Sequence, residues 1–204
     1  VGETRRILSG SELRFLKRNV QVEEALIRAF SEHNFELFYQ PVYNLRNRTI
    51  HAAEAMPRLK DPQLGVILPE EFLPIAIKND IMERLNALII EEVCLFLSSG
   101  IPTELGLMRI IVGISAYQCL NPRFLEDLKK NVRKYGVDAS LFNFALRDFS
   151  SEDDLPQLKQ VFDAMKEMGF RLSLDRFGMG NSNLQSLSVL RFDTVNIEDR
   201  KSVV

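Results

Sequence analysis

The spacing of apolar residues changes along this chain and marks out its elements. From Ser9 to His33 apolar residues recur every three or four positions, which predicts one amphipathic helix. Ser9 and Glu12 have the spacing of a capping box, so the helix should begin there. Two apolar stretches, Phe35–Leu45 and Thr49–Ala55, follow with a short polar turn between them. They predict an antiparallel hairpin.

After the hairpin, helix-spaced segments alternate with unbroken apolar runs. A loop over residues 60–69 precedes two predicted helices, Glu70–Lys78 and Met82–Ser98. Short apolar runs then predict four strands, at Met108–Ile114, Leu141–Leu146, Phe170–Leu174 and Thr194–Ile197. Further helices are predicted at Pro122–Tyr135, Asp153–Met168 and Ser182–Val189. Apolar strands separated by helices indicate an α/β fold with a parallel sheet, either closed into a barrel or open and doubly wound.

Composition narrows the function classes. The 204 residues are 46% hydrophobic and 26% charged with a net charge of -2, as in one soluble globular domain without an electrostatic footprint for nucleic acid or membranes. No apolar run reaches the roughly 18–20 residues that span a bilayer. Cys94 and Cys119 stand alone in apolar surroundings, which indicates buried thiols and excludes a disulfide framework or a zinc cluster. His33 and His51 lack ligand spacing and are interpreted as structural.

Polar or small residues follow each predicted strand at its C-terminal end, the edge where ligands bind in both barrels and open α/β sheets. These residues are Glu54 with Arg58, Gly113 with Ser115, Arg147 with Asp148, Asp175 with Arg176, and Asn196 with Glu198. The competing explanation for any one of these residues is that its strand reaches the surface there and needs a residue that water can solvate. Their coincidence at five strand ends favours a site. After Asp175, two glycines before a helix start allow backbone N–H groups to face an anion.

Several ordered motifs resemble those of EAL domains. They are Phe38–Val42, Ala53–Arg58, Pro69–Ala76, Val112–Ser115, Phe144–Asp148, Asp175–Gly180 and Val195–Glu198, and the resemblance extends from about Val22 to the end of the chain. EAL domains are bacterial cyclic di-GMP phosphodiesterases. The resemblance implies a TIM-like (β/α)8 barrel with an antiparallel first strand, in which Mg2+ or Mn2+ activates water against a phosphodiester.

The resemblance also implies a degraded metal site. Glu54 and Asp175 match family carboxylates, and Asp148 is a shortened match to a glutamate. Four family positions are lost, because an asparagine, a glutamate, an aspartate and a lysine are replaced by Gly113, Ala145, Arg176 and Asn196. Mg2+ takes about six oxygen ligands, and only two of the matched carboxylates remain. We therefore expect no metal, no cofactor and no catalysis by the family mechanism. Arg176 is expected either to neutralise the remaining carboxylates or to point to solvent.

Ligand binding without metal remains open. Gln40 and Arg58 match family positions for the guanine and a phosphate, and Arg176 offers a second phosphate contact, whereas Ile77 and Met179 make the rim less polar. The leading hypothesis is a catalytically inactive regulatory or protein-interaction module, partnered by another protein or its own upstream signalling domain. A cyclic di-GMP receptor is the alternative, and a weak phosphodiesterase is the third. A homodimer is a further candidate assembly.

The length suggests an incomplete barrel. A complete (β/α)8 barrel takes about 250 residues, and the family's last two strands are not found before Val204. We expect a helix or connector over residues 1–33 and a C-terminally truncated barrel domain over 34–204, with about six of eight strands. We interpret the chain as a cytoplasmic piece of a longer signalling protein. Whether that longer protein has a membrane anchor upstream of this piece is left open.

Overall fold

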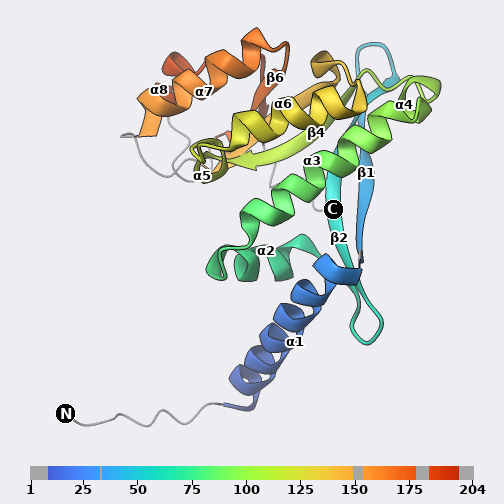
Figure 1. The fold of residues 1–204 in the computed structure, drawn as a ribbon, viewed down its shortest axis with the longest axis vertical. Helices are drawn as coiled ribbons and strands as arrows, with labels where there is room; N and C mark the ends of the chain where they lie inside the picture. Colours follow the sequence, from blue (N-terminus) through green and yellow to red (C-terminus); the bar gives the residue numbers. More distant parts are fainter. Residues whose placement is uncertain (1–8, 33, 149–153, 178–183, 198–204) are drawn as a thin grey trace. The chain divides into compact units, whose positions relative to one another are not determined.

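The computed structural model describes residues 9–32, 34–148, 154–177 and 184–197 (Figure 1). The chain divides into two compact units. The first unit comprises Val1–Phe38 and Pro57–Leu85, and the second comprises Tyr39–Met56 and Asn86–Val204.

One sheet holds the strands of the described residues. They are β1 (Phe35–Asn44), β2 (Thr49–Asp61), β3 (Gly65–Ile67), β4 (Arg109–Ser115), β5 (Phe142–Asp148), β6 (Arg171–Phe177) and β7 (Thr194–Ile197). Their order is β1-β2-β4-β5-β6-β7, and β3 pairs with β2. The pairs from β2–β4 through β6–β7 are parallel. A connection as short as that between β1 and β2 allows only antiparallel pairing. The mostly parallel sheet with an antiparallel first strand confirms the predicted fold class.

Helices alternate with the strands from β4 onward (Figure 1). The helices of the described residues are α1 (Gly10–Glu32), α2 (Pro69–Lys78), α3 (Met82–Ser98), α4 (Ile101–Glu104), α5 (Ala116–Cys119), α6 (Phe124–Tyr135), α7 (Leu155–Glu167) and α8 (Leu184–Val189). The sequence did not predict β3, α4 or α5, because segments of three or four residues are too short for a period to appear. None of the helices described combines the length and apolarity that crossing a membrane requires.

The strands of the second unit alternate between two faces. Along β4, every second residue is buried. The buried face is apolar and consists of Ile110, Val112, Ile114, Phe142, Phe144, Leu146, Leu172 and Leu174. Helix α6 packs on it, since the ring of Phe124 meets Phe144 edge-on with 6.5 Å between centroids. Side chains that alternate with this set lie on the opposite face, here called the polar face, which carries Asn143, Arg147, Ser173 and Asp175.

The first unit is built around the contact of α1 with α2. Val22, Ala25, Leu26 and Ala29 form the buried face of α1. The helix begins at the predicted capping box, in which Glu12 N donates to Ser9 Oγ over 3.3 Å and Ser9 N donates to Glu12 Oε2 over 2.8 Å. Across the two helices, Arg18 Nε donates to Glu71 Oε2 over 2.8 Å.

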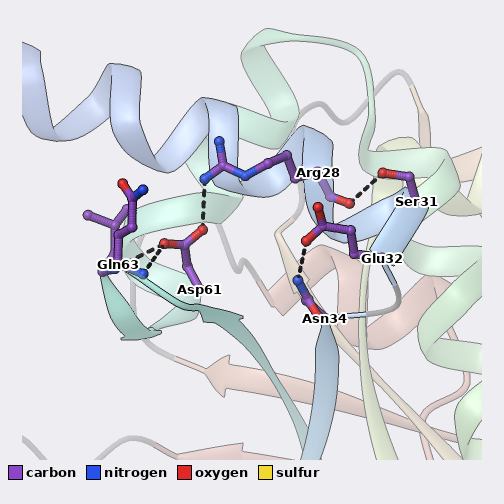
Figure 2. Close-up of polar contacts among 7 residues, drawn as sticks. Arg28, Ser31, Glu32, Asn34, Asp61 and Gln63 are labelled. Atoms are coloured by element: carbon purple, nitrogen blue, oxygen red, sulfur yellow. Dashed lines mark hydrogen bonds and ion pairs between the residues drawn. The ribbon is translucent and has the colours of Figure 1, made fainter.

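Asp61 connects the end of β2 to α1 in the first unit (Figure 2). Its Oδ2 accepts a hydrogen bond from Arg28 Nη2 over 2.8 Å, and its Oδ1 accepts from the backbone N–H groups of Gln63 and Leu64 over 2.9 and 3.0 Å. The side chain is only 3% exposed. The Arg28 hydrogen bond, followed by that from Leu64, lowers the pKa of the Asp61 carboxyl below its ordinary value. The turn between β2 and β3 therefore depends on an ionised carboxylate.

Replacing Asp61 with asparagine should lower the thermal unfolding midpoint at pH 7, because the amide keeps one acceptor but loses the charge that Arg28 pairs with. Because the pKa of Asp61 is lower in the folded than in the unfolded chain, its ionisation stabilises the fold at pH values above the unfolded-state pKa of about 3.9. This contribution is lost as the pH falls through the folded-state pKa. The gap between wild type and Asp61→Asn should therefore narrow below about pH 4. Circular dichroism melts across pH measure it.

The matched control is Glu36→Gln, which removes an exposed carboxylate paired with Lys60 in the same unit. Its melting midpoint should stay close to wild type, since exposed ion pairs contribute little. Wild type and Asp61→Asn curves that run parallel from pH 7 to pH 3 would contradict the role given to Asp61.

Candidate functional site

Strand register brings the candidate site residues to one face of the second unit. Glu54 of β2 pairs with Ile111 of β4, and Gly113 of β4 pairs with Ala145 of β5. Ala145 in turn pairs with Ser173 of β6. Because residues two apart share a face, Arg147 and Asp175 follow Ala145 and Ser173 on the polar face, toward the C-terminal edge of the sheet. Arg147 and Asp175 lie near the ends of β5 and β6, as predicted, whereas Glu54 and Arg58 lie inside β2, which runs on to Asp61 instead of ending at Ala55.

The guanidinium of Arg147 lies between two carboxylates. Its Nη2 donates to Glu54 Oε1, and its Nε lies 3.4 Å from Asp175 Oδ2, in ion-pair range. The Nε makes no hydrogen bond in the described part of the chain, so Asp175 is held by charge and Glu54 by charge and a hydrogen bond together. The three side chains are 30%, 28% and 20% exposed, for Arg147, Glu54 and Asp175 respectively. Partial burial reduces solvent screening and strengthens both pairs.

Gly113 leaves the space that this guanidinium fills. A Cβ atom on Gly113 would lie 2.5 Å from Arg147 Cζ, 2.6 Å from Nε and 2.9 Å from Nη1. All three distances are shorter than a van der Waals contact between such atoms, about 3.5 Å or more. Glycine here serves a close approach between neighbouring strands. Any larger residue, including the asparagine that the family places here, has to displace Arg147.

Arg176 does not have the neutralising role that we expected as one alternative. Its side chain is exposed, and no described residue forms an ion pair or hydrogen bond with it. The backbone φ of 53° puts it in the left-handed region, where β6 loses regular register with β7. The charge opposite Glu54 and Asp175 comes from Arg147 on the neighbouring strand. From the sequence, Arg147 was only one of several polar residues at strand ends, and nothing there placed it beside Gly113, because that contact depends on strand register.

The residues present do not fit a divalent metal. Mg2+ requires near-octahedral oxygen coordination, and neither Gly113 nor Ala145 carries a side-chain oxygen. The two matched carboxylates hold a guanidinium instead. Among the described residues, no three histidine, cysteine, aspartate or glutamate side chains come together as a metal-binding group. Asn196, in place of the family lysine, is exposed on β7, and the side chain of Asp148 lies outside the described part.

The residues expected to bind a dinucleotide lie on different units. Gln40 is exposed on β1 in the second unit. Arg58 belongs to the first unit, where its Nη1 donates to the Pro57 carbonyl over 3.0 Å and its guanidinium carbon lies 5.8 Å from the centre of the Phe38 ring. This leaves most of its five N–H donors for a ligand. Met179, Glu198 and His33, which the sequence also singled out, lie outside the described residues.

Both cysteines are free and buried, as predicted. Burial raises the pKa of the Cys94 and Cys119 thiols to about 12. A thiol with so high a pKa holds almost no thiolate at neutral pH, which agrees with two buried thiols that serve the core.

The described geometry can now be compared with known proteins. The family model for the EAL domain matches residues 23–201. The chain belongs to the EAL domain family. It is 24% identical over 181 residues to the cyclic di-GMP phosphodiesterase NbdA of Pseudomonas aeruginosa, and 30% identical over 192 residues to the probable cyclic di-GMP phosphodiesterase PdeG of Escherichia coli. These alignments cover 89% and 91% of this chain but only 23% and 36% of the relatives.

Solved structures agree on the fold. The PaMucR phosphodiesterase in complex with c-di-GMP superposes with a TM-score of 0.80 at 24% identity, covering 87% of this chain and 72% of that one. The FimX EAL domain of Xanthomonas citri, in complex with c-diGMP, gives a TM-score of 0.75 at 20% identity, with 89% and 70% coverage. The EAL fold predicted from the motifs is confirmed.

The contact between Gly113 and Arg147 predicts that their mutations are not additive. Gly113→Ala should lower the free energy of unfolding, because the new methyl group displaces the guanidinium from Glu54 and Asp175. In an Arg147→Ala background the three atoms nearest to the new methyl group are gone, and most of that cost should disappear. The expected coupling is about 1–2 kcal/mol, within the range for residues in contact. Urea unfolding of the four proteins measures it.

The matched control repeats the Gly113→Ala change in an Arg176→Ala background. Arg176 is an arginine of the same region without an ion pair to described residues, so the two changes should add. Additivity in the Arg147 cycle as well would show that Arg147 does not occupy the space beside Gly113.

Proposed function

We propose that this EAL domain is a catalytically inactive regulatory or protein-interaction module of cyclic di-GMP signalling. The observation that carries the proposal is the Arg147 guanidinium between Glu54 and Asp175. A permanent cation beside the two matched carboxylates opposes a divalent metal by Coulomb repulsion. The family mechanism depends on such a metal to activate water. Without such a metal, the chain shares the fold of the family but not its metal-dependent chemistry.

Three further replacements support the proposal, because they remove different parts of the same machinery. Gly113 and Ala145 remove oxygen ligands, and Asn196 removes the positive charge that the resemblance assigns to assisting the attacking water. Reversing any one of them would leave the others in place. A regulatory role needs none of these groups, and it requires only that the apolar skeleton of β4, β5 and β6 be kept.

A metal-independent cyclic di-GMP receptor is the second candidate. It is favoured by Arg58, whose guanidinium is half-buried, oriented by Pro57 and still rich in unused donors. Arginine forks recognise phosphate by two parallel hydrogen bonds. Exposed Gln40 offers an amide for a base edge. The relatives solved in complex with c-di-GMP place this ligand class on the same fold.

Two assays on the wild-type chain separate these functions. Incubation with cyclic di-GMP and either Mg2+ or Mn2+ should yield no linear product, which chromatography measures. Formation of linear product at a rate proportional to the protein concentration would overturn the proposal of inactivity.

Calorimetric titration with cyclic di-GMP in the presence and absence of metal then tests the receptor. Metal-independent binding that Arg58→Ala abolishes would establish the second candidate. The matched control is Arg123→Ala, which removes the same charge from an exposed arginine at the start of α6. A regulatory module of the first kind gives no binding with any of the three proteins.

A further inference from the structure

Two arginines at the N-terminal end of the polar face have no carboxylate partner in the described part of the chain. Arg109 is the first residue of β4, and Arg171 is the first residue of β6. Neither guanidinium lies within ion-pair range of a described carboxylate. Arg109 is nevertheless half-buried, and a charge that is taken out of water without a partner costs free energy.

Strand register places Asn143 of β5 between the two arginines. Asn143 pairs with Ile111 on one side and with Arg171 on the other, and Arg109 lies two residues before Ile111 on the same face. Because β5 separates β4 from β6, these two strands are about 10 Å apart. The two arginine side chains therefore leave the same face on either side of Asn143.

The charges of the two arginines act on each other. Burial, followed by the charge of Arg171, lowers the pKa of the Arg109 guanidinium below its ordinary value. Asp193 acts in the opposite direction, but its carboxylate is already engaged. Its Oδ2 accepts a hydrogen bond from Leu172 N over 2.8 Å, and its Oδ1 accepts from Lys166 Nζ over 3.4 Å. An anion placed between the two guanidiniums relieves their repulsion.

The other groups of the polar face do not supply that anion. Glu54 and Asp175 pair with Arg147. Asn143 is neutral, and its buried Oδ1 accepts no hydrogen bond in the described part of the chain. Half a turn of the amide puts the two N–H donors of Nδ2 in the place of this oxygen. Together with two guanidiniums, these donors form a set that suits a negatively charged ligand.

We propose that Arg109, Arg171 and Asn143 form a binding site for a small oxyanion of the kind of inorganic phosphate. Guanidinium groups bind such oxyanions by parallel, charge-assisted hydrogen bonds, and two of them balance a doubly charged ligand. The site lies at the starts of β4 and β6, whereas Arg147 and Asp175 lie near the ends of β5 and β6. The inference does not rest on the proposed function, because none of its three residues carries that proposal.

Calorimetric titration of the wild-type chain with inorganic phosphate, at constant ionic strength, tests the site. Saturable binding is expected. Arg109→Gln and Arg171→Gln should each raise the dissociation constant by at least about tenfold, because each removes one charge-assisted contact. The matched control is Arg133→Gln, which removes the same charge from an exposed arginine in the last turn of α6. Its dissociation constant should match that of wild type.

The isosteric change Asn143→Asp tests the site from the other direction. It places a carboxylate between the two arginines, so the chain then provides the missing charge itself. Phosphate binding should be lost, and the melting midpoint in phosphate-free buffer should rise by about 2–4 °C. Circular dichroism checks that each variant is folded. A wild-type chain that does not bind phosphate overturns the proposal. Binding that survives both arginine substitutions, or that survives Asn143→Asp, overturns it too.

Discussion

The charge balance on the polar face of the sheet depends on one arginine, Arg147, which pairs with the carboxylates of Glu54 and Asp175. Glu54 lies in β2 and Asp175 in β6, and both carboxylates pair with the Arg147 guanidinium on one face of the sheet. Two carboxylates so placed repel each other unless a cation lies between them. Arg147 on β5 supplies that cation from within the chain. The charge of these two acids is thereby balanced without an external cation.

This arrangement couples the replacements at the site to one another. Arg147 reaches its position because Gly113 on the adjacent strand has no side chain. Ala145, two residues before Arg147 on the same face, is small and buried. The glycine that replaces the family asparagine at position 113 and the placement of Arg147 thus form one structural solution. In the function we propose, Arg147 balances the charge of the two carboxylates as a metal ion would, but it supplies no Lewis acid to activate water.

Much of the fold was predictable from the sequence, because its long elements have clear periods. Helix α1 and its capping box, the hairpin of β1 and β2, and the alternation from β4 to β7 followed from apolar spacing and turn residues. The site was predicted only in part. The sequence identified Glu54 and Asp175, but their partner was sought at Arg176, the residue next to Asp175. A contact between neighbouring strands, such as that of Arg147 with Gly113, depends on register, which one sequence does not determine. The predicted domain boundary near residue 33 stays a prediction.

The central claim is that the Arg147 guanidinium occupies the position between Glu54 and Asp175 where a metal would need to bind. Anomalous diffraction from crystals of the chain soaked in MnCl2 tests it most directly, since manganese scatters anomalously and a guanidinium does not. We predict electron density for the guanidinium between the two carboxylates and no manganese peak there. A manganese peak coordinated by Glu54 and Asp175, with Arg147 turned away, would contradict the claim.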